Sequence, residues 1–204
     1  MKILVIGSGG REHVLVWKIK QSPLVKKIYC APGNAGMADL AECIDIKTED
    51  TKALLKFAKE HKIDLTVVGP ETPLAAGIVD EFEKEKFKIF GPGKEAARLE
   101  SSKAFSKDFM HECNIPTAPY MIFSKIEDAH TFLEKAQYPL VVKADGLASG
   151  KGVVICKDIK AGKEAVDKIM KAKIFGAAGK KIVIEECLQG EEVSILAFCD
   201  GKHF

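Results

Sequence analysis

The segment Leu140–Cys156, LVVKADGLASGKGVVIC, combines glycines and lysines in a pattern suited to binding phosphate. Glycines let backbone N–H groups approach an anion, and Lys143 and Lys151 can follow the oxygens of a polyphosphate. A Walker A loop is excluded, because three residues separate Gly146 from Gly150 and a glycine follows Lys151. The β-branched runs on both sides instead predict a hairpin whose loop forms a flap over the phosphate.

Three further loops in the first half contain glycine next to polar residues: Gly7–Arg11, Pro32–Gly36 and Gly69–Pro73. Each follows a short apolar run that predicts a strand. Backbone N–H groups at a helix N-terminus, reinforced by Arg11, can hold a small phosphate. Each loop taken alone could also be an ordinary turn, with Arg11 a solvated charge and Glu71 a partner of the helix dipole.

A dinucleotide site is a weaker reading of the first loop. Gly7 and Gly9 follow a strand, but Glu12 occupies the third glycine position. The second strand ends in Cys30 and Ala31, where a ribose-binding carboxylate would be required.

The elements that must position these loops follow from hydrophobic periodicity. The first half alternates strands and helices, which predicts a parallel sheet covered by helices, with ligands at the carboxyl ends of the strands. From about Glu100 the pattern changes: Ser101 or Ser102 caps a helix, and later segments predict antiparallel strands around the flap. The expected strands of the first half are Ile3–Ile6, Lys27–Ala31, Cys43–Ile46, Asp64–Gly69 and Phe87–Gly91.

The segment KIVIEECLQGEEVS is acidic where the flap is basic. We expect Lys181–Leu188 and Glu192–Cys199 to form strands, with the first leaving its ladder after Glu185. Free backbone groups there would suit the edge of a purine, and Glu192 could bind ribose hydroxyls. A solvated turn with clustered glutamates would explain the same pattern, and Lys103 could equally be a solvent-facing lysine.

Composition excludes several classes of protein. The 204 residues include 31 Lys plus Arg and 29 Asp plus Glu, so the net charge of +2 favours neither nucleic acid nor a membrane surface as partner. No stretch reaches the roughly 20 apolar residues of a membrane span. Six widely spaced cysteines without a C-x-x-C pair indicate reduced thiols, and we expect a cytoplasmic protein.

Seven segments occur in order along the chain: GSGGREH, APGNAG, VGPETPLAAGI, IFGP, LESSKAF, KADGLASGKGV and VIEECLQGEEVS. Together they resemble the phosphoribosylamine–glycine ligase (glycinamide ribonucleotide synthetase) family of the ATP-grasp superfamily. Thr72, Ser149 and Gly93 depart from the usual family residues.

This resemblance implies an α/β protein with a Rossmann-like substrate-binding domain at 1–100 and a partial ATP-grasp α+β domain at 101–204. It also implies a purine-biosynthesis ligase that joins glycine to 5-phosphoribosylamine at the expense of ATP. Lys103 and Lys143 would hold the nucleotide phosphates. The other residues implied for ATP are Gly146, Ser149, Gly150, Lys151, Gly152, Glu185, Glu186, Cys187, Leu188 and Glu192. Those implied for phosphoribosylamine are Gly9, Gly10, Arg11, Gly33, Asn34, Gly69, Pro70 and Glu71.

Members of this family are about twice as long, so we expect a fragment, with the Mg²⁺ ligands beyond residue 204 and little turnover by this chain alone. The parent could also be a longer multifunctional purine enzyme. Alternatives are another ATP-grasp carboxylate–amine ligase, a non-catalytic ATP or phosphosugar-binding module, and a nicotinamide dehydrogenase.

Overall fold

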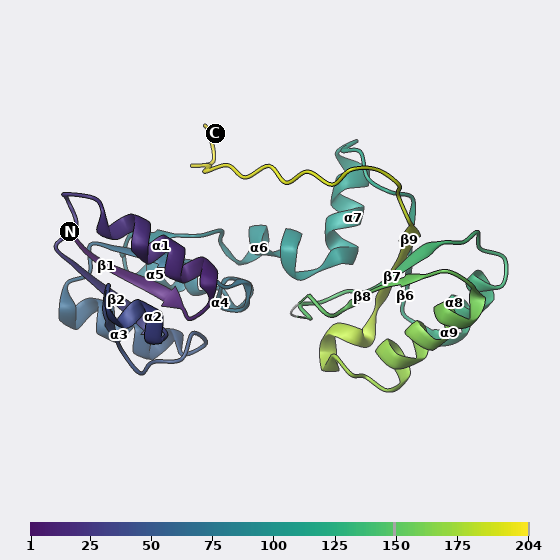
Figure 1. The fold of residues 1–204 in the computed structure, drawn as a ribbon, viewed down its shortest axis with the longest axis horizontal. Coiled ribbons are helices and arrows are strands. Elements are labelled where there is room, and N and C mark those ends of the chain that lie inside the picture. Colours follow the sequence, from purple (N-terminus) through teal and green to yellow (C-terminus); the bar gives the residue numbers. More distant parts are fainter. Residues whose placement is uncertain (149, 204) are drawn as a thin grey trace.

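The computed structural model describes residues 1–148 and 150–203, which form two lobes joined by two helices (Figure 1). The N-terminal lobe is a five-stranded parallel sheet of order β3-β2-β1-β4-β5, covered by helices. Its elements are β1 Lys2–Gly7, α1 Gly10–Lys20, β2 Lys27–Pro32, α2 Ala35–Ala38, β3 Glu42–Cys43, α3 Thr51–His61, β4 Leu65–Val68, α4 Glu71–Ala76, α5 Ile78–Lys84 and β5 Ile89–Phe90.

Two apolar cores lie on the two faces of this sheet. In β1, Leu4 and Ile6 belong to one core, whereas Ile3 and Val5 belong to the other, as expected for a strand covered on both sides. The first core also holds Phe82 of α5, which is fully buried. The sheet is therefore held rigidly beneath the loops that leave its carboxyl edge.

Helices α6 (Lys94–Ser101) and α7 (Lys103–Glu112) lie between the lobes (Figure 1). Ser102 caps α7, since its Oγ accepts a hydrogen bond from Phe105 N at 3.2 Å, so the second of the two predicted caps is the one used. The guanidinium of Arg98 stacks 3.8 Å from the Phe105 ring centroid and links the two helices.

The C-terminal lobe is an antiparallel sheet of order β6-β9-β7-β8. One face packs against α8 and α9 through a core that includes Leu133, Val142 and Ile184. The expected hairpin is present as β7 and β8. The elements are β6 Tyr120–Phe123, α8 Ile126–Leu133, β7 Leu140–Ala144, β8 Val153–Cys156, α9 Ile159–Val166, a π-helical turn Asp167–Lys171, a 3-10 turn Gly176–Lys180 and β9 Ile182–Glu186.

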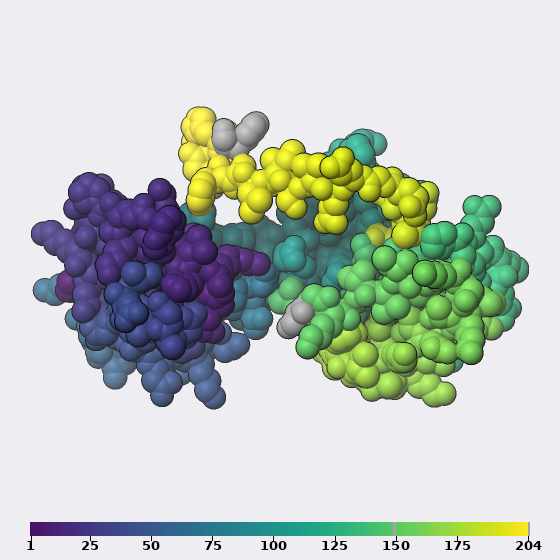
Figure 2. Space-filling view, viewed as in Figure 1, coloured from purple at the N-terminus to yellow at the C-terminus, as the bar shows by residue number. Residues whose placement is uncertain are grey.

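The strand expected over 192–199 is wrong. Residues 191–200 run as an exposed, unpaired segment from β9 back toward the N-terminal lobe, where the Phe198 ring lies 5.8 Å from that of Phe90 (Figures 1 and 2). The alternating apolar residues suit a strand, but β9 is already flanked by β6 and β7, so no ladder position beside it is free. Ile195 and Leu196 are consequently 92% and 91% exposed.

The fold class expected from the sequence is confirmed: a parallel α/β lobe is followed by an α+β lobe with an antiparallel sheet. No helix among the described residues is long and apolar enough to cross a membrane.

Candidate functional site

The three glycine-containing loops of the N-terminal lobe meet at one sheet edge. They follow β2, β1 and β4, which are adjacent parallel strands, and the chain reverses its direction of progress across the sheet at β1. Such a switch point opens a crevice for ligands at the carboxyl ends of the strands. The residues placed at this edge are Gly9, Gly10, Arg11, Gly33, Asn34, Gly69, Pro70 and Glu71.

Direct hydrogen bonds tie these loops together. Asn34 Nδ2 donates to Ser8 O at 2.8 Å. Arg11 Nη1 donates to Gly69 O at 3.2 Å and pairs with Glu71 Oε1 at 2.8 Å. A cavity of about 370 Å³ lies here, with Arg11, Glu71 and Glu100 among its lining residues.

The hydrogen bond between Arg11 and Glu71 raises the pKa of the guanidinium and lowers that of the carboxyl. Both side chains stay open to solvent, at 65% and 40% exposure. Arg11 therefore remains a permanent, accessible cation beside glycine-rich backbone, which suits binding of a phosphate monoester.

Glu12 is buried at this sheet edge, and the sequence reasoning did not identify its structural role. Its side chain is 5% exposed, and its Oε2 accepts a hydrogen bond from Gly9 N at 2.7 Å. A Cβ added at Gly69 would lie only 2.5 Å from Glu12 Cδ, and one at Gly7 only 2.7 Å. Its place three residues after the cap residue Gly9 was the available signal, since glutamate there completes half of a capping box.

In the C-terminal lobe, the base of the flap is attached to the N-terminus of α7. Asp145 Oδ1 accepts hydrogen bonds from Ser102 Oγ at 2.9 Å and Ala104 N at 2.8 Å. Lys103 N donates to Asp145 O at 3.0 Å, and Lys103 Nζ donates to Gly146 O at 3.2 Å. Burial lowers the pKa of Lys103. The structure therefore brings Lys103 to the flap, and Asp145, which the sequence reasoning did not single out, makes the connection.

Glycines of the flap have different surroundings. Gly146 approaches Ala178, where an added Cβ would lie 2.7 Å from the Ala178 Cβ. Gly150 has a φ of +75° and open space around it, so it serves the turn rather than a close contact. Lys151 is exposed, Gly152 is buried, and the predicted residue Ser149 lies outside the described residues.

Lys143 lies next to a second lysine that the sequence reasoning missed. The carboxylate of Glu185, 6% exposed, forms an ion pair through Oε1 with Lys143 Nζ. Its Oε2 lies 2.5 Å from Lys107 Nζ and forms a second ion pair with it. Lys107 is on α7, four residues after Lys103, and its Nζ also donates to Thr117 Oγ1 at 2.8 Å. We call Lys107, Lys143 and Glu185 the lysine–glutamate cluster.

The expectation that the strand leaves its ladder after Glu185 is wrong by one residue. Glu185 is paired with Tyr120 and Val141, and Glu186 N still donates to Pro119 O at 3.0 Å. The first backbone groups beyond the strand are those of Cys187 and Leu188, which are half-buried and exposed respectively. Glu192 lies in the exposed segment, and no ion pair or hydrogen bond of the described residues joins it to the lysines.

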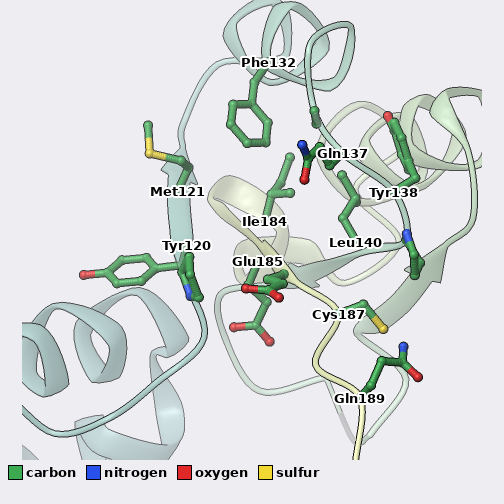
Figure 3. A pocket seen from close by; sticks show the side chains of 14 residues that line it. Tyr120, Met121, Phe132, Gln137, Tyr138, Leu140, Ile184, Glu185, Cys187 and Gln189 are labelled. Carbon is green, nitrogen blue, oxygen red and sulfur yellow. The ribbon is translucent and has the colours of Figure 1, made fainter.

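A cavity of about 560 Å³ occupies the opposite face of the same sheet. Figure 3 shows Met121, Phe132 and Ile184 around it, with Tyr120 directed away. Met121 and Ile184 are register partners on the helix-covered side, whereas Tyr120 and Glu185 are partners on the lysine side. The cavity reaches the cluster at Glu185, which is one of its lining residues, whereas Lys107 and Lys143 are not among them.

Metal-ligating side chains do not cluster in the part of the chain that the structure describes. Across residues 1–148 and 150–203, no group of three His, Cys, Asp or Glu side chains is placed to hold a metal ion. The Mg²⁺ ligands that the family resemblance implies are therefore not found as a cluster within the described residues.

The chain matches two family models along its length. Residues 1–100 match the model described as phosphoribosylglycinamide synthetase, N domain, and residues 101–204 match phosphoribosylglycinamide synthetase, ATP-grasp (A) domain. It is 54% identical over 202 residues to the phosphoribosylamine–glycine ligase of Clostridium acetobutylicum and 52% identical over 203 residues to that of Caldanaerobacter subterraneus, covering 99% and 100% of this chain.

A solved structure shares the fold. The crystal structure of phosphoribosylamine–glycine ligase from Thermotoga maritima aligns with a TM-score of 0.76 and 31% identity, over 94% of this chain and 45% of that one. The chain spans about half the length of the curated relatives it matches, 49% in both bacterial examples. With both family models matched in sequence order, the chain belongs to the phosphoribosylglycinamide synthetase family.

Proposed function

We propose that this chain forms the phosphosugar-binding lobe and the ATP phosphate-binding half of a phosphoribosylamine–glycine ligase of purine biosynthesis. Its relatives bear that name, and the chain keeps the two features such a reaction needs: an anion-binding sheet edge and a basic flap region. The hydrogen bond that Lys103 Nζ donates to Gly146 O of the flap is the observation that carries the proposal.

In the proposed reaction, a glycine carboxylate oxygen attacks the γ-phosphorus of ATP, which gives glycyl phosphate and ADP. The amine nitrogen of 5-phosphoribosylamine then attacks the acyl carbon, loses a proton and expels phosphate, giving glycinamide ribonucleotide. Charge grows on the transferring phosphoryl oxygens, and fixed cations with water excluded lower that barrier. Lys143 and Lys103 would supply the charge, and the flap would cover it.

The remaining contacts are assigned by position. Backbone groups of Glu186, Cys187 and Leu188 leave β9 beside the cluster and would read the adenine edge, with Glu192 on the ribose. At the other lobe, Arg11 and the N–H groups of Gly9 and Gly10 would take the phosphate of phosphoribosylamine. The proposed division at residues 100 and 101 is supported by the two sheets with separate cores and by the extents of the family models.

The proposal includes a cytoplasmic location. All six cysteines carry free thiols, including the exposed Cys113 and Cys199. Free thiols of this kind persist in a reducing compartment.

Titration calorimetry with ATP tests the nucleotide site. We expect the chain to bind ATP and Lys143→Ala to weaken binding by more than about tenfold, because a partly buried charge contact is lost. Lys163→Ala is the matched control, since it removes an exposed ion pair with Glu134 in the same lobe. Equal affinities for the wild type and Lys143→Ala would remove this lysine from the site.

A further inference from the structure

Lys107 is a buried cation on α7 with no direct place in the reaction described above. It is 9% exposed, a burial that lysine seldom reaches without partners. Its Nζ contacts Thr117 Oγ1 at 2.8 Å, Ala118 O at 3.4 Å and Glu185 Oε2 at 2.5 Å. These three partners fix its position.

Lys143 has the opposite surroundings. Its side chain is 26% exposed, and the interaction found for its Nζ within the described residues is the one with Glu185 Oε1. Lys143 therefore faces solvent on one side and a buried carboxylate on the other. The strength of the attraction between the Glu185 carboxylate and Lys143 determines how readily the ammonium group of Lys143 can interact with a phosphate.

Charge counting shows what Lys107 contributes. The lysine–glutamate cluster holds two ammonium groups and one carboxylate, so one positive charge is in excess. Without Lys107, Glu185 and Lys143 would form a neutral pair. An incoming phosphate would then meet the field of a buried carboxylate that no second cation offsets, and in a partly buried site such a field is poorly screened.

We propose that Lys107 is a positioning residue of the nucleotide site, which acts through Glu185 to leave the charge of Lys143 available to a phosphate. This inference rests on the proposed function for the role of Lys143, and it adds a residue buried beneath the site. Lys107 touches neither nucleotide nor substrate.

The simpler explanation is that the ion pair only fastens α7 to β9. Both explanations predict that Lys107→Met lowers the stability of the protein, so a loss of stability in that variant alone is not decisive. They differ for the double variant Lys107→Met/Glu185→Gln. If Lys107 acts through its charge, removing the Glu185 carboxylate as well restores one excess positive charge in the cluster. If the ion pair only fastens α7 to β9, removing the second partner restores nothing.

The test measures ATP affinity by calorimetry for the wild type, Lys107→Met, Lys107→Arg and the double variant, with thermal unfolding of each. We expect about tenfold weaker binding in Lys107→Met, near wild-type binding in Lys107→Arg, and recovery to within about threefold in the double variant. Lys163→Met/Glu134→Gln, which removes an exposed pair of the same lobe, should leave affinity unchanged. A double variant that binds as weakly as Lys107→Met would overturn the proposal.

A second readout needs no nucleotide. Trace labelling of folded protein with acetic anhydride, followed by mass spectrometry, reports the availability of the Lys143 amine relative to the exposed Lys163. We expect slower labelling of Lys143 in Lys107→Met and recovery in the double variant. If the wild type binds no ATP yet labelling follows this order, the proposed function fails and the coupling stands. Unchanged labelling in Lys107→Met refutes the coupling itself.

Discussion

The buried carboxylate of Glu12 should determine whether a side chain can be tolerated at Gly69. Gly69 has no positive φ, so alanine is compatible with its backbone. The obstacle is contact: an added Cβ would overlap Oε1, Cγ and Cδ of Glu12. Glu12 cannot move away easily, because it is 5% exposed and holds Gly9 N at 2.7 Å.

The magnitudes follow from these contacts. Glu12→Ala should cost about 2–3 kcal/mol, since a charge-assisted hydrogen bond is lost and Gly9 N is left without it. Gly69→Ala should cost about 1–3 kcal/mol as an overpacked site. In the Glu12→Ala background the overlapping atoms are gone, so adding Gly69→Ala should cost less than about 0.5 kcal/mol. The two changes should therefore be strongly non-additive.

Urea unfolding followed by fluorescence provides the assay. The single tryptophan, Trp17, lies on α1 and reports on the lobe that contains Glu12. Gly10→Ala is the matched control: Gly10 begins α1, nothing lies within 4 Å of an added Cβ, and we expect a neutral or slightly stabilising effect. An equal cost for Gly69→Ala in both backgrounds would refute the proposed contact.

Three further predictions concern single groups. Burial raises the pKa of the Cys30 thiol to about 12, so at pH 8 iodoacetamide should alkylate the exposed Cys113 while leaving folded Cys30 unmodified; comparable rates would contradict its burial. Phe82→Ala should lower the free energy of unfolding by about 3–5 kcal/mol, measured by urea titration, because the ring is fully buried. Arg11 depresses the pKa of Glu71 below its usual 4.5, so this pair stabilises above pH 4.5 and is lost as the pH falls through the lower folded value. The effect is under about 1 kcal/mol for so exposed a pair, and Arg11→Met should raise the Glu71 pKa in an NMR titration.

Periodicity and loop chemistry were sufficient to predict the parts of the fold that depend on short-range pattern. The alternation of strands and helices predicted the parallel sheet, and with it the meeting of the loops after β1, β2 and β4. The flap hairpin followed from β-branched runs around a glycine loop. These features are local, or follow from the rule that parallel strands share a carboxyl edge.

The errors arose where pairing decides the outcome. Residues 192–199 have the composition of a strand, yet a strand also needs a neighbour, and both sides of β9 are occupied. Glu185 was expected to offer its backbone to a ligand, but register with Tyr120 and Val141 keeps that backbone in the ladder. Neither fact is encoded in the local pattern.

Residues that act at long range were missed for a related reason. Asp145 lies 43 positions from Ser102, and Lys107 lies far from Glu185 in the chain, so no spacing rule connects them. Lys107 looked like one more helix-surface lysine, since most lysines are exposed. Glu12 was the exception, because its capping position is readable from sequence.

Helix α7 and its cap residue provide one partner in each of the contacts to the flap and to β9. Lys103 and Lys107 are four residues apart and so lie on one face of the helix, where the first reaches the flap at Gly146 and the second reaches β9 at Glu185. The same helix end is held by Asp145 at the flap base. The base of the flap is therefore fixed to α7, and these bonds set the position of Lys103 relative to β7, the strand that contains Lys143.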